Sequence, residues 1–295
     1  MFSGSIPALV TPFKKDESID EECLRFLINW HIRNKSDAIL VCGTTGESAT
    51  LTHKEHKEVI KIAVEEAKGR IPIIAGCGSN STQEARELAE FSQSVKADAI
   101  LVITPYYNKP TQEGLYEHYK KIATSVKLPL IIYNVPSRTG INIMPETVSR
   151  LYKDCRNVVG IKEASGNLDQ ISRLMTLVDR RFVLLSGSDE ITLPILSVGG
   201  KGVISVVANI MPRKTHDLVV SFLKGDWEKA RKIQFYLYPL IKALFIETNP
   251  IPVKTALGFM GLINPALRLP LYKMSQNNLE KLKKILERYK LINET

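Results

Sequence analysis

Eight short apolar runs recur along the chain, and each is followed by a segment with helical character. The runs are near-continuous rather than alternating with polar residues, which is typical of parallel strands that are covered on both faces. They span residues 5–13, 38–43, 71–78, 99–105, 129–135, 158–164, 182–188 and 202–209. Eight strand-then-helix units close a (β/α)8 barrel, so the sequence predicts a TIM barrel of the α/β class.

The remaining sequence argues against the main rival fold and indicates an additional C-terminal region. An open doubly wound sheet would be unusually wide, and the sequence has no GxGxxG dinucleotide fingerprint. After the eighth run the pattern is wholly helical and longer than one closing helix requires, with a break at Pro250 and Pro252. We therefore expect a barrel over residues 1–225 and a C-terminal helical region over residues 226–295 that packs on the barrel.

Two helix starts can be read directly from the sequence. Thr52, with Glu55 three residues later, forms a capping-box pattern. Pro145 occupies a favourable first position for the helix that follows it. We expect a helix to begin at each of these points.

The net charge of +9 comes from 40 Lys and Arg against 31 Asp and Glu. These residues are mixed along the chain, and no basic run with interleaved aromatic residues is present, as a nucleic-acid surface would require. We therefore expect no nucleic-acid partner. The excess charge favours solubility and attracts anions.

Cysteine usage and hydropathy indicate a compartment. Cys23, Cys42, Cys77 and Cys155 form no CxxC pair and no zinc spacing, which fits a reducing environment. The N-terminal stretch lacks the basic region and cleavage site of a signal peptide. The longest weakly charged run, residues 193–210, is interrupted by glycines and a lysine, so it makes a poor membrane span. We expect a soluble cytoplasmic protein with no membrane partner.

Lys162 interrupts the sixth apolar run, within NVVGIKEASG at residues 157–166. A buried unpaired ammonium is costly and tends to lose its proton, which leaves a nucleophilic amine. The alternative is a lysine beyond the strand end that reaches water. Barrel active sites lie at the carboxyl ends of the strands, where Lys162 would be, and this favours the functional interpretation. Glu163 should point to the helix layer, with a structural partner and no catalytic role.

Other strand ends would bring polar groups to the same mouth of the barrel. The turn formed by Thr44, Thr45 and their flanking glycines suits a carboxylate, and Arg138 offers a guanidinium fork. A desolvated amine can form a Schiff base with a ketone, and the enamine that follows attacks an aldehyde. Tyr133, with a hydroxyl relay through Thr45, would move the protons.

Five motifs carry a resemblance to a known family. They are GTTGESATL, TPYYNKPTQEGLYEHY, YNVPSRTG, GIKEASGN and GGKGVISV. Together they resemble the dihydrodipicolinate synthase family of pyruvate-dependent class I aldolases, from Phe2 to beyond Pro270. The resemblance implies a TIM barrel with a C-terminal helical extension, assembled as a homotetramer of two tight dimers. It also implies a Schiff-base lyase that condenses pyruvate with L-aspartate 4-semialdehyde, the committed step of diaminopimelate and L-lysine biosynthesis.

The resemblance assigns catalytic roles. Lys162 matches the lysine that forms the Schiff base with pyruvate. Tyr133, Thr45 and Tyr107 match a proton relay, in which Tyr107 reaches into the neighbouring subunit's site. No cofactor and no metal are expected beyond the covalent adduct on Lys162.

The resemblance also assigns substrate contacts. Thr44 and Thr45 match the contacts to the carboxylate of pyruvate, and Ile204 matches a backbone contact beside it. Gly187 matches a backbone contributor at the end of the seventh strand. Arg138 matches the residue that holds the carboxylate of the semialdehyde.

Two alternatives remain beside this function. One is a retro-aldol relative, either like N-acetylneuraminate lyase or a 2-keto-3-deoxy-sugar-acid aldolase. Arg138 disfavours it, because those enzymes take polyol aldehydes. The other is a barrel without activity that only binds lysine, which would not need Lys162, Tyr133 and the threonine turn.

His53 and His56 raise the question of a metal. Their HKEH spacing matches neither HExxH nor HxxEH, so we expect no metal. In lysine-inhibited members of the family, an allosteric pocket lies at the tight-dimer interface, and every matching position here carries a fitting residue. These positions are Ser48, Ala49, His53, His56, Asn80, Glu84 and Tyr106. The resemblance therefore implies feedback inhibition by L-lysine.

Overall fold

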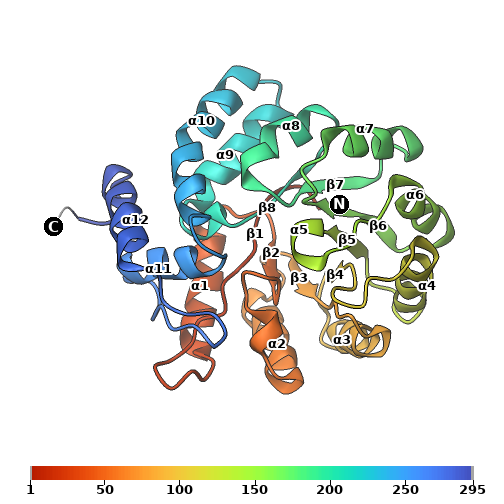
Figure 1. Ribbon diagram of the computed structural model, residues 1–295, viewed down its shortest axis with the longest axis horizontal. Helices are drawn as coiled ribbons and strands as arrows, with labels where there is room; N and C mark the ends of the chain where they lie inside the picture. The colour runs from red at the N-terminus through yellow and green to blue at the C-terminus, as the bar shows by residue number, and fades with distance from the viewer. Residues whose placement is uncertain (1, 294–295) are drawn as a thin grey trace.

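Eight parallel strands form one sheet that closes on itself (Figure 1). The structure is a computed structural model and describes residues 2–293. The sheet order is β1-β8-β7-β6-β5-β4-β3-β2, and a parallel bridge between Ala8 and Leu40 joins its two ends. The strands are β1 Gly4–Pro7, β2 Ile39–Val41, β3 Ile73–Gly76, β4 Ala99–Ile103, β5 Leu130–Asn134, β6 Val158–Glu163, β7 Val183–Ser186 and β8 Gly202–Ser205. The predicted TIM barrel is confirmed.

Helices cover the outside of the sheet, as the alternating pattern predicts. They are α1 Glu21–Arg33, α2 His53–Ala67, α3 Thr82–Ser94, α4 Gln112–Ala123, α6 Pro145–Asp154, α7 Leu168–Leu177, α8 Thr192–Ser197 and α9 Pro212–Leu223, with short 3-10 turns η1 Ser48–Thr50, η2 Asp189–Ile191 and η3 Val207–Asn209. The short helix α5 Pro136–Thr139 follows β5 and lies inside the ring of helices (Figure 1). Both predicted starts are confirmed. Thr52 forms a capping box with Glu55 before α2, and Pro145 is the first residue of α6.

Three further helices make up the C-terminal part. They are α10 Trp227–Leu244, α11 Ile251–Phe259 and α12 Gln276–Arg288. α10 packs along α9, and α12 contacts both α10 and α11 (Figure 1). The expected break at Pro250 and Pro252 lies between α10 and α11, where Pro252 falls in the first turn of the new helix. The division at residues 225 and 226 remains a proposal.

The apolar side chains form two layers. One cluster fills the barrel, including Ile6, Leu40, Ile131 and Leu185, and a larger cluster lies between the strands and the surrounding helices. Successive strand residues point to alternate layers, which is why one strand can supply side chains to both. Within residues 2–293, no helix has the length and hydropathy that crossing a bilayer would need.

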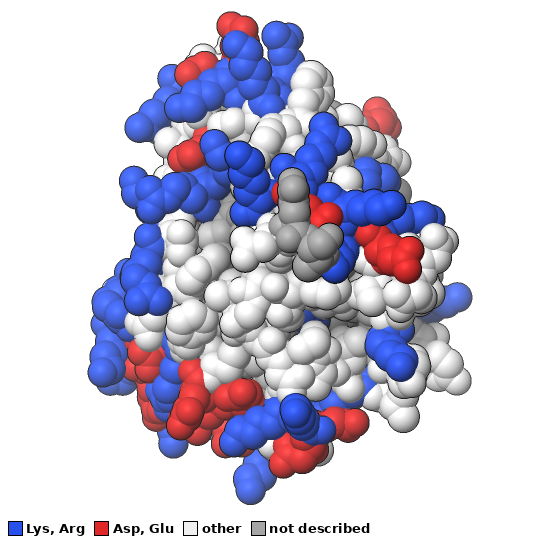
Figure 2. All heavy atoms as spheres, turned by 90° about the vertical axis from the view of Figure 1, so that its left-hand side faces the viewer, with Lys and Arg blue, Asp and Glu red and all other residues white. Residues whose placement is uncertain are grey.

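Charge is unevenly distributed over the side of the molecule that carries the C-terminal helices. Figure 2 shows mostly Lys and Arg at the top of this face, mixed acidic and basic groups at the bottom, and an uncharged centre. A surface with an excess of positive charge raises the local concentration of small anions.

Candidate active site

Lys162 lies inside the mouth of the barrel on β6 and is 5% exposed. Its Nζ is 4.0 Å from the centroid of the Tyr133 ring, and the two residues are register partners on adjacent strands. Among the described residues, none hydrogen-bonds to Nζ or forms an ion pair with it. A buried amine without a carboxylate partner is suited to nucleophilic attack on a carbonyl.

Gly187 leaves room beside this amine. A Cβ at position 187 would lie 3.2 Å from Lys162 Cε and 2.7 Å from Ala164 Cβ, closer than side chains normally pack. The Gly187 N–H donates to the Glu163 carbonyl at 2.7 Å. Ile204, on β8, is 2% exposed and belongs to the cluster that fills the barrel.

Glu163 points to the opposite side of β6. Asn134 Nδ2 donates to both of its carboxylate oxygens at 3.1 Å, and the Ser165 N–H donates to Oε1 at 2.7 Å. Burial raises the pKa of the Glu163 carboxyl, while these donors oppose the shift. The prediction of a structural partner for Glu163 is confirmed.

The threonine turn follows β2 and is closed by its own backbone. The Gly46 N–H donates to the Gly43 carbonyl and the Glu47 N–H to the Thr44 carbonyl, each at 3.1 Å. Thr11 Oγ1 donates to the Gly46 carbonyl at 2.6 Å. Thr44 is partly buried and Thr45 is 2% exposed, so the two hydroxyls differ in their access to water.

Asn249 joins Thr45 to Arg138. Asn249 Nδ2 donates to Thr45 Oγ1 at 2.9 Å, and an Arg138 guanidinium N–H donates to the Asn249 carbonyl at 3.1 Å. Because Thr45 Oγ1 accepts from Asn249, its own proton remains free to be donated. Sequence reasoning missed Asn249 and used its motif, ETNPIPVK, only as a helix break.

The tyrosines of the predicted relay are arranged differently from one another. Tyr133 is 6% exposed and lies over Lys162, whereas Tyr107 is 89% exposed and has a left-handed φ of 70°. No hydrogen bond within residues 2–293 joins Thr45 to either tyrosine. One subunit therefore brings Lys162 and Tyr133 together but leaves Tyr107 outside its own mouth.

A cavity of about 440 Å³ extends from the threonine turn toward α2. Thr44 and Arg138 line it at one end, and it includes six of the seven residues of the predicted lysine site. The six are Ser48, Ala49, His53, His56, Glu84 and Tyr106. The seventh, Asn80, accepts a hydrogen bond from Asn108 through its carbonyl.

The far end of this cavity combines an imidazole and a carboxylate. The His56 ring Nε2 lies 2.7 Å from the Gly76 carbonyl, and burial lowers the pKa of His56. Ser79 Oγ donates to Glu84 at 2.7 Å, and His53 Nε2 is 3.8 Å from the same carboxylate. A ligand with both an ammonium and a carboxylate could find partners here.

A second buried lysine lies behind the threonine turn. Lys254 Nζ donates to Glu47 Oε1 at 2.6 Å, and both side chains are 0% exposed. Burial lowers the pKa of the Lys254 ammonium, and the Glu47 carboxylate opposes that shift. Sequence reasoning missed this pair, although Lys254 is the only charged residue in the apolar helix α11.

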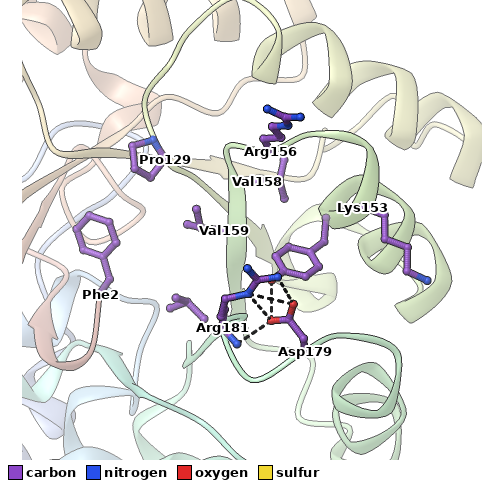
Figure 3. Close-up of a pocket in the computed structure, with 10 residues that line it drawn as sticks. Phe2, Pro129, Lys153, Arg156, Val158, Val159, Asp179 and Arg181 are labelled. Carbon is purple, nitrogen blue, oxygen red and sulfur yellow. Dashed lines mark hydrogen bonds and ion pairs between the residues drawn. The ribbon is translucent and has the colours of Figure 1, made fainter.

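A hollow of about 710 Å³ lies at the opposite end of the barrel, at the amino ends of β6 and β7. Figure 3 shows Phe2, Pro129 and Val159 around it, with Arg181 bound to Asp179 at its edge. None of the predicted site residues lines it. The groups suited to carbonyl chemistry are therefore gathered at the carboxyl ends of the strands. Among residues 2–293, no three His, Cys, Asp or Glu side chains are grouped so that they could hold a metal ion.

Comparison with known proteins places this geometry in a family. Residues 1–289 match the Dihydrodipicolinate synthetase family. The 4-hydroxy-tetrahydrodipicolinate synthase of Syntrophus aciditrophicus (strain SB) is 55% identical over 292 residues, which cover 99% of this chain and 100% of that protein.

Solved structures agree. Dihydrodipicolinate synthase from Aquifex aeolicus is 51% identical with a TM-score of 0.98, covering 99% of this chain and 100% of that one. The enzyme from Cyanidioschyzon merolae with lysine bound is 40% identical with a TM-score of 0.96, covering 99% of each chain. The match in sequence and in fold extends over nearly the whole length, and the chain therefore belongs to the dihydrodipicolinate synthetase family.

Proposed function

We propose that this protein condenses pyruvate with L-aspartate 4-semialdehyde to give 4-hydroxy-tetrahydrodipicolinate, a step of diaminopimelate and L-lysine biosynthesis. The observation that carries the proposal is the buried, unpaired amine of Lys162 in a chain 55% identical to a 4-hydroxy-tetrahydrodipicolinate synthase. An amine in this state attacks a ketone without first breaking an ion pair.

The proposed steps use groups at the same mouth. Lys162 Nζ attacks the ketone carbon of pyruvate, and loss of water leaves an iminium. Loss of a methyl proton gives the enamine, whose carbon attacks the aldehyde of the second substrate. The amino group of that substrate then attacks the iminium carbon, which closes the ring and releases Lys162 as a free amine. Tyr133, Thr45 and a partner subunit's copy of Tyr107 move the protons, since Tyr107 is 89% exposed in its own subunit. No cofactor is part of the proposal.

Substrate carboxylates are held at two places. Thr44 and Thr45 bind the carboxylate of pyruvate, with Gly187 and Ile204 contributing backbone contacts. Arg138 binds the carboxylate of the semialdehyde, and its contact with the Asn249 carbonyl orients the guanidinium toward the cavity that both residues line. A guanidinium suits a carboxylate better than a polyol, which argues against a sugar-acid aldolase.

Borohydride trapping tests the chemistry. With pyruvate present, reduction should leave a covalent adduct on Lys162 that peptide mass spectrometry locates. A coupled assay with the semialdehyde then measures turnover. An unmodified Lys162 would overturn the mechanism, and trapping without turnover would favour the sugar-acid aldolase.

Arg138→Ala tests the second carboxylate site. Its semialdehyde turnover should fall by about 100-fold, the loss expected for a charged hydrogen bond, while pyruvate still forms the adduct. Equal loss of both activities would contradict the role given to Arg138.

We propose that the far end of the 440 Å³ cavity, which contains His53, His56 and Glu84, binds L-lysine as a feedback inhibitor. Glu84 would take the side-chain ammonium, and Asn80 would bind the carboxylate. The lysine-bound relative from Cyanidioschyzon merolae supports this use of the fold. Initial rates measured with and without lysine test it, and Glu84→Gln should weaken any inhibition without changing the uninhibited rate.

Assembly and location complete the proposal. We infer a homotetramer of two tight dimers, located in the cytoplasm. The 89% exposure of Tyr107 supports its action in a partner's site across the tight dimer. Sedimentation of the purified protein tests the assembly, and a fully active monomer would contradict it.

A further inference from the structure

The ion pair between Lys254 and Glu47 joins the C-terminal helices to the turn that meets the substrate. Glu47 follows Thr45 by two residues, whereas Lys254 lies on α11. The Phe13 ring packs against the amine, with its centroid 4.1 Å from Lys254 Nζ. None of the catalytic steps described above uses this pair.

Glu47 has an unusual backbone that needs support. Its φ of 53° and ψ of 36° are left-handed, a conformation that a residue with a side chain keeps only when its surroundings impose it. Lys254 holds carboxylate Oε1, and the Arg268 N–H donates to Oε2 at 3.2 Å. Both oxygens of Glu47 are thus fixed by the C-terminal part of the chain.

The same segment also holds the other side of the turn. Asn249, five residues before Lys254, donates to Thr45 Oγ1. The segment that begins α11 therefore contacts the turn at Thr45 and at Glu47. These two contacts fix both the path of the backbone and the direction in which the Thr45 hydroxyl can donate.

Lys254 itself cannot meet a substrate. It is 0% exposed and does not line the 440 Å³ cavity, whereas Thr44, Glu47 and Asn249 do. Any influence on the reaction must therefore pass through neighbouring groups, of which Glu47 in the turn is the hydrogen-bond partner of Lys254.

We propose that Lys254 is a positioning residue, which acts through Glu47 to hold Thr44 and Thr45 in the geometry that binds the carboxylate of pyruvate and relays protons. This inference rests on the proposed function of the site. A turn that moves by about 1 Å can lose about 100-fold in rate, so the effect should be large for a residue that never touches substrate.

The experiment separates positioning from stability. Lys254→Met leaves Glu47 buried without a cation, which should lower the melting temperature. The double variant Glu47→Gln with Lys254→Met has no buried charge and should recover most of that temperature. For the double variant we expect kcat/KM for pyruvate to stay about 100-fold low, with KM raised and kcat reduced.

Two further variants complete the design. Glu47→Gln alone keeps an acceptor for Lys254 and should lose only about 10-fold in kcat/KM, because Lys254 can still donate to the amide oxygen at position 47. It provides the same measurement if the double variant does not fold. Lys242→Met removes the cation of an exposed ion pair with Glu190, at 2.8 Å, and should keep the wild-type rate.

The outcomes are distinct. Wild-type trapping and turnover are measured first, so a failure of the proposed function is seen before the variants are compared. A double variant with wild-type melting temperature and wild-type kcat/KM would overturn the positioning role. Reduced kcat/KM at restored stability supports it, as does a reduced rate in a fully folded Glu47→Gln protein.

Discussion

Lys162 and Lys254 are both buried within apolar elements, and both amines lie over an aromatic ring at nearly the same distance, 4.0 Å from Tyr133 and 4.1 Å from Phe13. They differ in their charged neighbours. Glu47 is 2.6 Å from the amine of Lys254, whereas no carboxylate within the described residues forms an ion pair with Lys162. Burial raises the pKa of the Asp189 carboxyl, and the charge of Lys162 opposes that shift without forming an ion pair.

The difference shows how burial alone leaves the role of a lysine undecided. An amine paired with a buried carboxylate is held in place and kept from reacting, because attack on a carbonyl would strand the carboxylate. An amine without such a partner, at the end of a strand that opens to a cavity, is free to change its covalent state. The partner, rather than the burial, distinguishes the structural lysine from the one proposed to be catalytic.

The largest expected effect is on catalysis by Lys162. Lys162→Met should lower kcat by at least about 10⁴-fold, the scale on which removal of a covalent nucleophile acts. Steady-state turnover and borohydride trapping measure it. If Lys162→Met kept a tenth of the wild-type rate, Lys162 would not be the nucleophile, and the proposed difference between the two lysines would be wrong.

For stability we expect the opposite order, with the larger loss from replacing Lys254 rather than Lys162. Lys254→Met should lower the free energy of unfolding by about 3–5 kcal/mol, because it leaves Glu47 buried and unpaired. Lys162→Met breaks no ion pair among the described residues and should change it by less than about 1.5 kcal/mol. Urea unfolding of both variants measures these losses. Equal losses would show that the ion pair between Lys254 and Glu47 makes no particular contribution to stability.

The space beside Lys162 offers a sharper test. In Gly187→Ala the new methyl group would press on Lys162 Cε and Ala164 Cβ. We expect the rate of pyruvate capture to fall by about 10-fold, since the amine must leave its attack position. Gly114→Ala, on α4, adds the same methyl group away from the site and serves as the control. If Gly187→Ala and Gly114→Ala captured pyruvate at equal rates, the packing argument would be contradicted.

The smallest effect is a dependence on pH. Burial lowers the pKa of Lys254 below its ordinary value of 10.5. Between the lowered value and 10.5 the unfolded chain binds more protons here than the folded protein, so stability from this group rises with pH. Compared with the Glu47→Gln and Lys254→Met double variant, the wild type should gain stability as the pH rises through the interval below 10.5. If the difference in stability between wild type and double variant became smaller as the pH rose, folding would raise the pKa of Lys254 rather than lower it.

The barrel could be predicted from sequence because its signal is local and repeated. Seven of the eight strands lie within their apolar runs, β1 begins one residue before its run at Gly4, and every strand ends earlier than its run does. Cys42, for example, belongs to the second run yet has a left-handed φ of 54°. The residues after each strand are apolar because they are buried in loops, and apolar character alone does not distinguish a strand from a buried turn.

The candidate site could be predicted only in part. Lys162 stands out because a charged residue is rare in a buried strand. Lysines are common in helices, so Lys254 does not stand out in the same way. α11 is apolar on all sides, which indicates a helix buried all round and would have marked its one lysine. The contact of Asn249 with Thr45 joins residues 204 positions apart, and no local pattern encodes it.

The ion pair has a consequence for the order in which the protein is made. Glu47 leaves the ribosome 207 residues before Lys254. At about 5–20 residues per second, the carboxylate is without its cation for roughly 10–40 s. A buried carboxylate without a cation opposes native packing during that interval. The turn proposed to bind pyruvate is thus translated with the first strands, but its ion pair forms only after all eight strands have been made and α11 docks.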